Sequence, residues 1–251
     1  MFLTDCMKSE NNLLKKINNH IRNGTIYKVA FNYLKKPFRK FNKRYPLLFQ
    51  RDVYNKLRYG PKAPINHERI WVNPADVKQM LVPSEVKRIT GKTRDQTSAK
   101  IINWDQVEKT RPVMGEFKIK YCFQHWVKGK SWDELEVIDF LKTNSKKHRN
   151  RSVEELKKRF EVLDKAFEEV KKEGRLKTMK ELNPDNYREY DGVLIHIGKD
   201  GEPFFGSCGN HRLAMAIILD IEKIPAWIGL VDKDSIKYLD KYRMPPESEK
   251  K

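Results

Sequence analysis

The residues best suited to bind a ligand or take part in a reaction lie in one short stretch, residues 206–212. This stretch reads Gly-Ser-Cys-Gly-Asn-His-Arg. Small residues let an anion approach the backbone closely, and free backbone N–H groups at the start of a helix attract it. Arg212 would stand in the first helical turn, where acidic residues are normally preferred. A cation at that place is explained if it pairs with an anion, because a guanidinium binds phosphate through two hydrogen bonds. His211 beside it could donate a hydrogen bond or transfer a proton.

The elements that must position this stretch are predicted by changes in hydrophobic period. Alternating residues at 193–197 and a short apolar run at 203–205 predict two strands joined by the turn 198–201. An apolar helix is expected over 211–219 and a further strand over 224–231. The first strand is expected to be half-buried, with His196 as a structural histidine.

Residues 205–216, Phe-Gly-Ser-Cys-Gly-Asn-His-Arg-Leu-Ala-Met-Ala, followed by Ile-Pro-Ala-Trp at 224–227, resemble the core motif of the ParB/sulfiredoxin-like superfamily. In that superfamily a strand leads into a Gly-x-His-Arg or Gly-x-Arg-Arg turn, then an Ala/Leu-rich helix, then a strand. The similarity covers residues 190–232, and residues 70–74 resemble the superfamily's opening strand more weakly. Asn210 stands where sulfiredoxins carry the reactive cysteine, and no helix-turn-helix domain of the partition proteins follows Val231 in this sequence. The chain therefore resembles a branch without these two features.

What the resemblance implies is a nucleotide, ATP or CTP with Mg²⁺, whose phosphates are held by the loop and the helix start. The expected function is an ATP- or CTP-dependent phosphotransferase or NTPase. His211 is the candidate catalytic residue, with Glu202 in the preceding turn as the nearest carboxylate. The candidate nucleotide-binding residues are Ser207, Cys208, Gly209, Asn210, His211 and Arg212.

Other chemistry was weighed for the same residues. Cys122 with His125, and Cys208 with His211, are two Cys-x-x-His pairs that could form a zinc site, although such residues more often pack in a core and no metal is expected. Cys208 could be a reactive thiol at a helix start, but a small residue in a tight turn is the simpler interpretation. Trp126, Trp132 and Lys130 could cover a ligand base, and core packing is favoured.

The distribution of charge supports two rival functions. The formal net charge is +18, and residues 1–60 alone hold 14 Lys and Arg against three acids. Residues 11–22 and 26–44 have apolar residues at helical spacing between these cations. Residues 11–60 could therefore bind nucleic acid, as in a ParB-like nuclease, or dock a non-enzymatic accessory protein on an anionic membrane surface. A helical extension with a solvated basic face is the plainer interpretation.

The fold expected is α+β: a small mixed sheet with packing helices. Capping boxes at Ser131 and Ser152 predict helices to about Thr143 and to just before Gly174. Arg69-Ile70-Trp71-Val72 predicts a strand, Asn73-Pro74 a helix through about Met80, and residues 90–115 a loop. The expected domains are a basic helical extension, 1–60, and a ParB/sulfiredoxin-like domain, 61–251, with a helical insertion at about 105–175.

The sequence indicates the cellular compartment only through the features that it lacks. The longest apolar run, residues 213–219, is far shorter than the roughly 20 residues that cross a bilayer. No secretory signal is visible, and three widely spaced cysteines offer no disulfide framework. A cytoplasmic protein is expected, peripheral to a membrane or to nucleic acid under the rival functions.

Overall fold

The computed structural model describes residues 49–91, 96–144 and 148–247. The chain divides into two compact units, residues 1–50 and 51–251, and the account below concerns the second. The helices predicted at 11–22 and 26–44 lie outside the described residues. Residues 51–59 are helical and form the start of the second unit, where the buried Asn55 Nδ2 donates to the carbonyl oxygens of Pro64 and Ala99, each at 2.8 Å.

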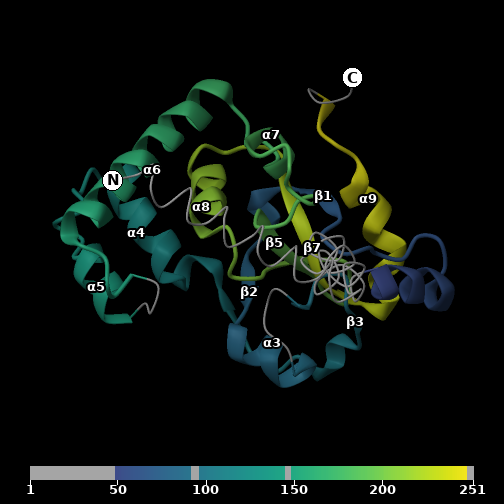
Figure 1. The fold of residues 1–251 in the computed structure, drawn as a ribbon. Coiled ribbons are helices and arrows are strands. Elements are labelled where there is room, and N and C mark those ends of the chain that lie inside the picture. The colour runs from purple at the N-terminus through teal and green to yellow at the C-terminus, as the bar shows by residue number, and fades with distance from the viewer. Residues whose placement is uncertain (1–48, 92–95, 145–147, 248–251) are drawn as a thin grey trace, which may run out of the picture. The chain divides into compact units, whose positions relative to one another are not determined.

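Seven strands of the described residues form one mixed sheet in the order β1-β7-β5-β6-β2-β4, with β3 pairing parallel to the end of β7 (Figure 1). β5 pairs parallel with β7 and antiparallel with β6, while β1 pairs antiparallel with β7. This confirms the α+β class. The strands are β1 (Arg69–Val72), β2 (Gln79–Leu81), β3 (Ile101–Ile102), β4 (Thr110–Pro112), β5 (Val193–Ile197), β6 (Pro203–Phe205) and β7 (Ile224–Asp232).

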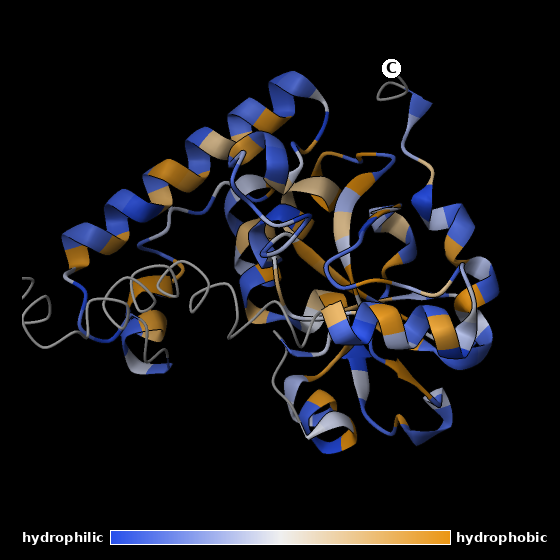
Figure 2. Ribbon diagram, turned by 45° about the vertical axis from the view of Figure 1, so that its right-hand side comes forward, coloured by the Kyte–Doolittle hydropathy of each residue, from blue (hydrophilic) through white to orange (hydrophobic). Residues whose placement is uncertain are grey.

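The helices of the second unit gather largely on one side of this sheet, where α8 lies between the strands and the pair α4 and α6 (Figure 1). The labelled helices are α3 (Pro83–Thr90), α4 (Phe117–Trp126), α5 (Val137–Asn144), α6 (Val153–Glu173), α7 (Met179–Leu182), α8 (Asn210–Ile218) and α9 (Leu239–Arg243). The helix predicted from Ser152 is confirmed, with a complete capping box at its start and Gly174 in the left-handed conformation at its end. Figure 2 shows its alternation of polar and apolar residues.

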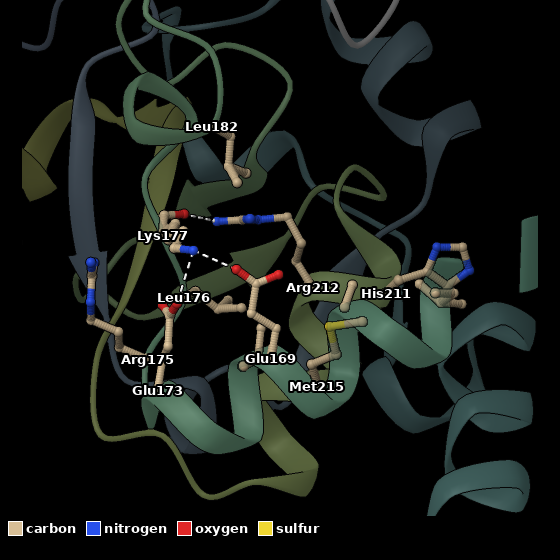
Figure 3. Close-up of a pocket in the computed structure, with 12 residues that line it drawn as sticks. Glu169, Glu173, Arg175, Leu176, Lys177, Leu182, His211, Arg212 and Met215 are labelled. Carbon is tan, nitrogen blue, oxygen red and sulfur yellow. Dashed lines mark hydrogen bonds and ion pairs between the residues drawn. The ribbon is translucent and has the colours of Figure 1, made fainter. Parts of the chain in front are cut away.

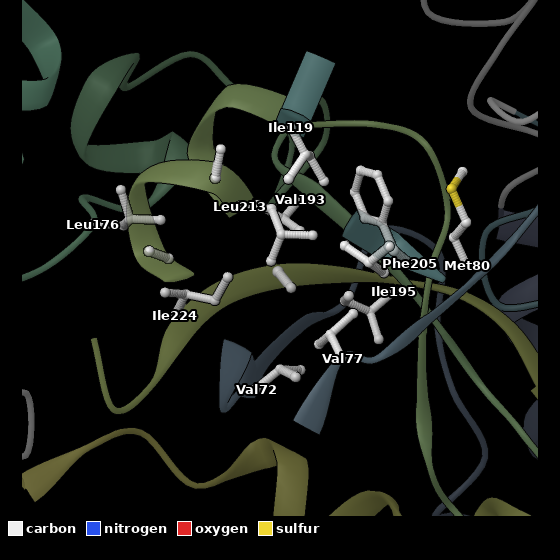
Figure 4. Close-up of a cluster of buried hydrophobic side chains, with 14 of the residues drawn as sticks. Val72, Val77, Met80, Ile119, Leu176, Val193, Ile195, Phe205, Leu213 and Ile224 are labelled. Atoms are coloured by element: carbon white, nitrogen blue, oxygen red, sulfur yellow. The ribbon is translucent and has the colours of Figure 1, made fainter. Parts of the chain in front are cut away.

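The core fills the space between α8 and the sheet (Figure 4). Val193, Ile195 and Leu213 are fully buried there, whereas Leu194 packs in a second cluster with Trp227 on the other face of the sheet. β5 is consequently buried on both faces, and the expectation of a half-buried strand was wrong. Its alternation reflects two differently packed faces rather than a core and a solvent face.

Three local predictions were wrong, two of them because strand pairing over long sequence distances decided the outcome. The helix expected through Met80 stops as a 3-10 helix, Pro74–Asp76, and Met80 instead pairs with Phe205 of β6. The segment 90–115, expected as a loop, contributes β3 and β4. The capping box at Ser131 forms, but turns follow it and α5 begins only at Val137.

The aromatic stretch of α4 and the following turn packs as core, as favoured from the sequence. Trp126 stacks on Phe167 at 4.4 Å between ring centroids, and Trp132 stacks on Phe160 at 4.7 Å. Both indole N–H groups donate to the carboxylate of Asp164, at 3.0 and 2.9 Å. These contacts join α4 to α6, so the two helices that flank α8 hold a defined relative position.

Candidate functional site

The loop between β6 and α8, residues 206–209, is pressed against β5. A Cβ added to Gly206 would lie 2.4 Å from Leu194 Cγ, and one added to Gly209 would lie 2.8 Å from Val193 Cα. Gly209 has φ +77° and Ser207 has φ 62°, so the turn uses the left-handed region twice within three residues. From the sequence, the small residues of this stretch were interpreted as leaving room for a ligand. The structure shows that they also allow the loop to pack closely on β5.

The start of α8 is left open by this turn. Gly209 is the N-cap and provides no side-chain hydrogen bond, and the first bond inside the helix runs from the N–H of Leu213 to the carbonyl of Gly209. The N–H groups of Asn210, His211 and Arg212 belong to the first turn, which a helix cannot satisfy internally. Asn210 Oδ1 is buried and accepts no hydrogen bond from the described residues. The first turn of α8 thus contains backbone donors that the helix does not use and, on Asn210, one buried acceptor.

His211 faces α4, where its Nε2 is hydrogen-bonded to the hydroxyl of Tyr121 at 2.6 Å. Burial, together with the charges of Arg159, Lys118 and His148, lowers the pKa of His211 to about 3. Burial also raises the pKa of Tyr121. The imidazole is therefore neutral at pH 7, held by a neutral phenol. Sequence reasoning missed Tyr121, since no local signal relates positions 90 residues apart.

Arg212 extends from α8 toward the segment that follows α6, as Figure 3 shows. Its Nη2 donates to the carbonyl oxygen of Lys177 at 2.5 Å, while its Nε is buried and donates to no acceptor among the described residues. Burial lowers the pKa of Arg212, and the carboxylates of Glu189 and Glu181 oppose that effect. This half-buried side chain therefore joins the start of α8 to the segment after α6.

A pocket of about 270 Å³ lies beside the first turns of α8. We call it the α6–α8 pocket. Glu169 and Glu173 stand at i and i+4 of α6, so they share one face of that helix. Lys177 Nζ forms ion pairs with both carboxylates, at 2.5 and 2.8 Å (Figure 3). The lining consists of Leu163, Ala166, Glu169, Val170, Glu173, Arg175, Leu176, Lys177, Leu182, His211, Arg212 and Met215.

Of the other predicted site residues, Cys208 lies in the loop and Glu202 lies away from it. Glu202 stands in the turn at the opposite end of β6 from the loop, where its Oε2 accepts from the N–H of Asp200 at 2.9 Å. Cys208 is buried, and its Sγ lies 3.8 Å from Asp191 Oδ1, so Asp191 is a carboxylate that the fold brings to the loop. His196 is fully buried and accepts from the N–H of Leu230 at 2.8 Å, as expected of a structural residue.

The two Cys-x-x-His pairs are not brought together as a ligand set. His125 Nε2 contacts Asp164 Oδ1 at 3.1 Å, whereas His211 contacts Tyr121. Within residues 49–91, 96–144 and 148–247, no group of three or more His, Cys, Asp or Glu side chains is arranged to hold a metal ion. Over the same ranges, no helix combines the length and apolar character that crossing a membrane requires.

Comparisons with known proteins leave the site to be interpreted from its own geometry. No family model matches the chain, and neither the curated proteins nor the solved structures provide a match.

Proposed function

We propose that this chain is a nucleotide-binding protein of the ParB/sulfiredoxin-like type, acting as an ATP- or CTP-dependent phosphotransferase or NTPase. One observation carries the proposal: the uncapped first turn of α8 stands next to Arg212, whose Nε is buried without an acceptor among the described residues. Backbone N–H groups at a helix start and a guanidinium from the same helical turn are groups that bind phosphate. The order of strand, tight loop, helix and strand in residues 193–232 supports the resemblance.

The residues around the start of α8 would have different roles in binding and transferring a phosphate. The first-turn N–H groups of α8 would bind phosphate oxygens, and Arg212 would neutralise the charge that develops on them during transfer. His211 is neutral at pH 7, and its low pKa suits it to orient an attacking hydroxyl or water by a hydrogen bond rather than to take up its proton. Mg²⁺ would supply charge neutralisation between phosphate oxygens, and the buried Oδ1 of Asn210 and the carboxylate of Asp191 are oxygen donors of the type it prefers.

Thermal unfolding with ligands tests this function. ATP, CTP, GTP, UTP and inorganic tripolyphosphate are compared with and without Mg²⁺, because a ligand that binds the native state raises its stability by mass action. We expect a rise in melting temperature with ATP or CTP that Arg212→Ala abolishes. The variant also loses the bond to Lys177, at a cost of about 1–3 kcal/mol. The ligand-induced shift, rather than the melting temperature itself, is therefore the readout.

The exposed Arg58 provides the matched control, because Arg58→Ala removes the same charge from a position outside the site. A full ligand-induced shift in Arg212→Ala would contradict the phosphate-site assignment. No shift with any of the five ligands in the unmodified chain would contradict nucleotide binding altogether.

A second candidate function, docking on an anionic membrane surface, is favoured by one feature of helix 51–59. Val53, Tyr54 and Leu57 are 41%, 58% and 83% exposed, next to the cations of Lys56 and Arg58. An apolar patch beside basic side chains is typical of helices that lie in a membrane interface. Sedimentation with phosphatidylserine vesicles, and loss of binding in Leu57→Glu, would support it. Equal binding to neutral phosphatidylcholine vesicles would contradict it.

A further inference from the structure

The carboxylate of Asp164 on α6 is contacted by three ring nitrogens from the end of α4 and the turn after it. The indole N–H groups of Trp126 and Trp132 donate to its two oxygens, at 3.0 and 2.9 Å. His125 Nε2 lies 3.1 Å from Oδ1 of the same carboxylate. An ionised carboxylate can only accept hydrogen bonds, so the proton of this third contact must belong to the imidazole.

The other ring nitrogen of His125 also faces an acceptor. Its Nδ1 lies 2.5 Å from the carbonyl oxygen of Lys130, in the turn after α4. A carbonyl oxygen has no proton to donate, so Nδ1 must be the donor in this contact as well. A neutral imidazole carries one N–H group and one bare nitrogen, and it can therefore satisfy only one of the two contacts. Both are satisfied together by the imidazolium, which carries two protons and a positive charge.

The remaining surroundings of the ring suit this charge. The imidazole stacks on the indole of Trp132, with 3.8 Å between the ring centroids, and an aromatic face attracts a cation. Burial raises the pKa of the Cys122 thiol, about one turn earlier on α4, so that group is uncharged. Lys128 and Lys130 are exposed residues of the turn after α4. The carboxylate of Asp164 on α6 is therefore the charged group that contacts the ring within the described part of the chain.

We propose that His125 is an imidazolium in this structure and that, with Asp164, it forms a pH-sensitive clasp between α4 and α6. When the pH increases and the ring releases one proton to water, a bare nitrogen faces an oxygen, and the contact with Asp164 or with Lys130 is lost. The stabilisation is consequently present at low pH and lost as the pH increases. Tyr121 lies about one turn before His125 on α4 and bonds to His211, so the clasp holds the helix that supports the start of α8. This inference does not depend on nucleotide binding.

Long-range ¹H–¹⁵N correlation spectra of the unmodified chain test the protonation state, because they distinguish a ring with two N–H groups from either neutral tautomer. We expect two N–H groups on His125 at about pH 6 and a neutral tautomer at about pH 8. In Asp164→Asn, which removes the charge of the acceptor, this transition should move to lower pH. Asp133→Asn is the matched control, since Asp133 is 67% exposed and pairs with Lys157, and it should leave the transition unchanged. A neutral tautomer at about pH 6 in the unmodified chain, or the same transition in Asp164→Asn, would overturn the proposal.

Urea denaturation of the unmodified chain and of His125→Gln measures the effect on stability. The two side chains of the pair are 21% and 37% exposed, so the effect is modest. We expect the substitution to raise the equilibrium constant of unfolding about fivefold at about pH 6 and less than about twofold at about pH 8. His196 and His211 titrate alike in both proteins, so their contribution cancels in this ratio. A ratio that is independent of pH, or that grows toward pH 8, would contradict the clasp.

The spectra keep the proposal testable if His125→Gln does not fold, because they are recorded on the unmodified chain.

Discussion

Replacing Gly209 by alanine tests how the loop is held against the sheet. Two costs add at this position. An L-residue in the left-handed region loses roughly 1–2 kcal/mol, and Gly209 has φ +77°. The added Cβ would also lie 2.8 Å from Val193 Cα and 2.9 Å from the carbonyl oxygen of Gly192. These are backbone atoms of a buried strand and its start, which cannot turn aside as a flexible side chain can, so overpacking adds about 1–3 kcal/mol.

Gly174 provides the matched control at the end of α6. Its φ is +66°, but an added Cβ would meet nothing within 4 Å. Gly174→Ala should therefore lose only the conformational cost, about 1 kcal/mol. Gly209→Ala should lose about 3 kcal/mol in total, and the difference between the two variants measures the contact with β5.

Urea denaturation followed by circular dichroism gives both free energies of unfolding. The reasoning requires Gly209→Ala to be less stable than Gly174→Ala by at least about 1 kcal/mol. Equal losses in the two variants would show that the loop is not packed against Val193, and the description of an α8 start fixed by the sheet would have to be abandoned.

Three other perturbations have definite outcomes. Burial lowers the pKa of His196 and of His211 to about 3 from 6.5, so the unfolded chain binds more protons below pH 6.5. The free energy of unfolding should then fall as the pH decreases from 6.5, by up to about 1.4 kcal/mol per pH unit for each imidazole, and a flat profile from pH 6.5 to 5 in urea denaturation would refute both pKa values. Tyr121→Phe removes the partner of His211 Nε2 and should cost about 1 kcal/mol by the same assay, whereas Tyr59→Phe, at an exposed ring, should cost nothing measurable. If residues 1–48 bind duplex DNA, the logarithm of the affinity should decrease with the logarithm of the salt concentration by about 0.9 per phosphate contacted. Deleting 1–48 should then remove most of that slope, and a slope that persists would place the contact in the remaining chain.

The sequence by itself determined the elements whose signals are local. The capping box at Ser152 and Gly174 at the opposite end predicted α6, because both ends of that helix are specified by residues within a few positions. The alternation in 193–197 and the apolar run at 224–231 predicted β5 and β7, which form the centre of the sheet. Glycines and small residues also predicted a phosphate site at the loop before α8, and this stays a prediction.

Only the tertiary structure decided which residues meet at that loop. Met80 belongs to a strand, β2, because it pairs with Phe205 on the neighbouring strand β6. No local sequence pattern predicts this pairing. Arg212 turns toward Lys177, and Tyr121 reaches His211, because α4, α6 and α8 pack together. Helix periodicity specifies the face on which a side chain lies but not the segment that this face will contact. The partners of the site residues, and with them the α6–α8 pocket, therefore follow from long-range packing alone.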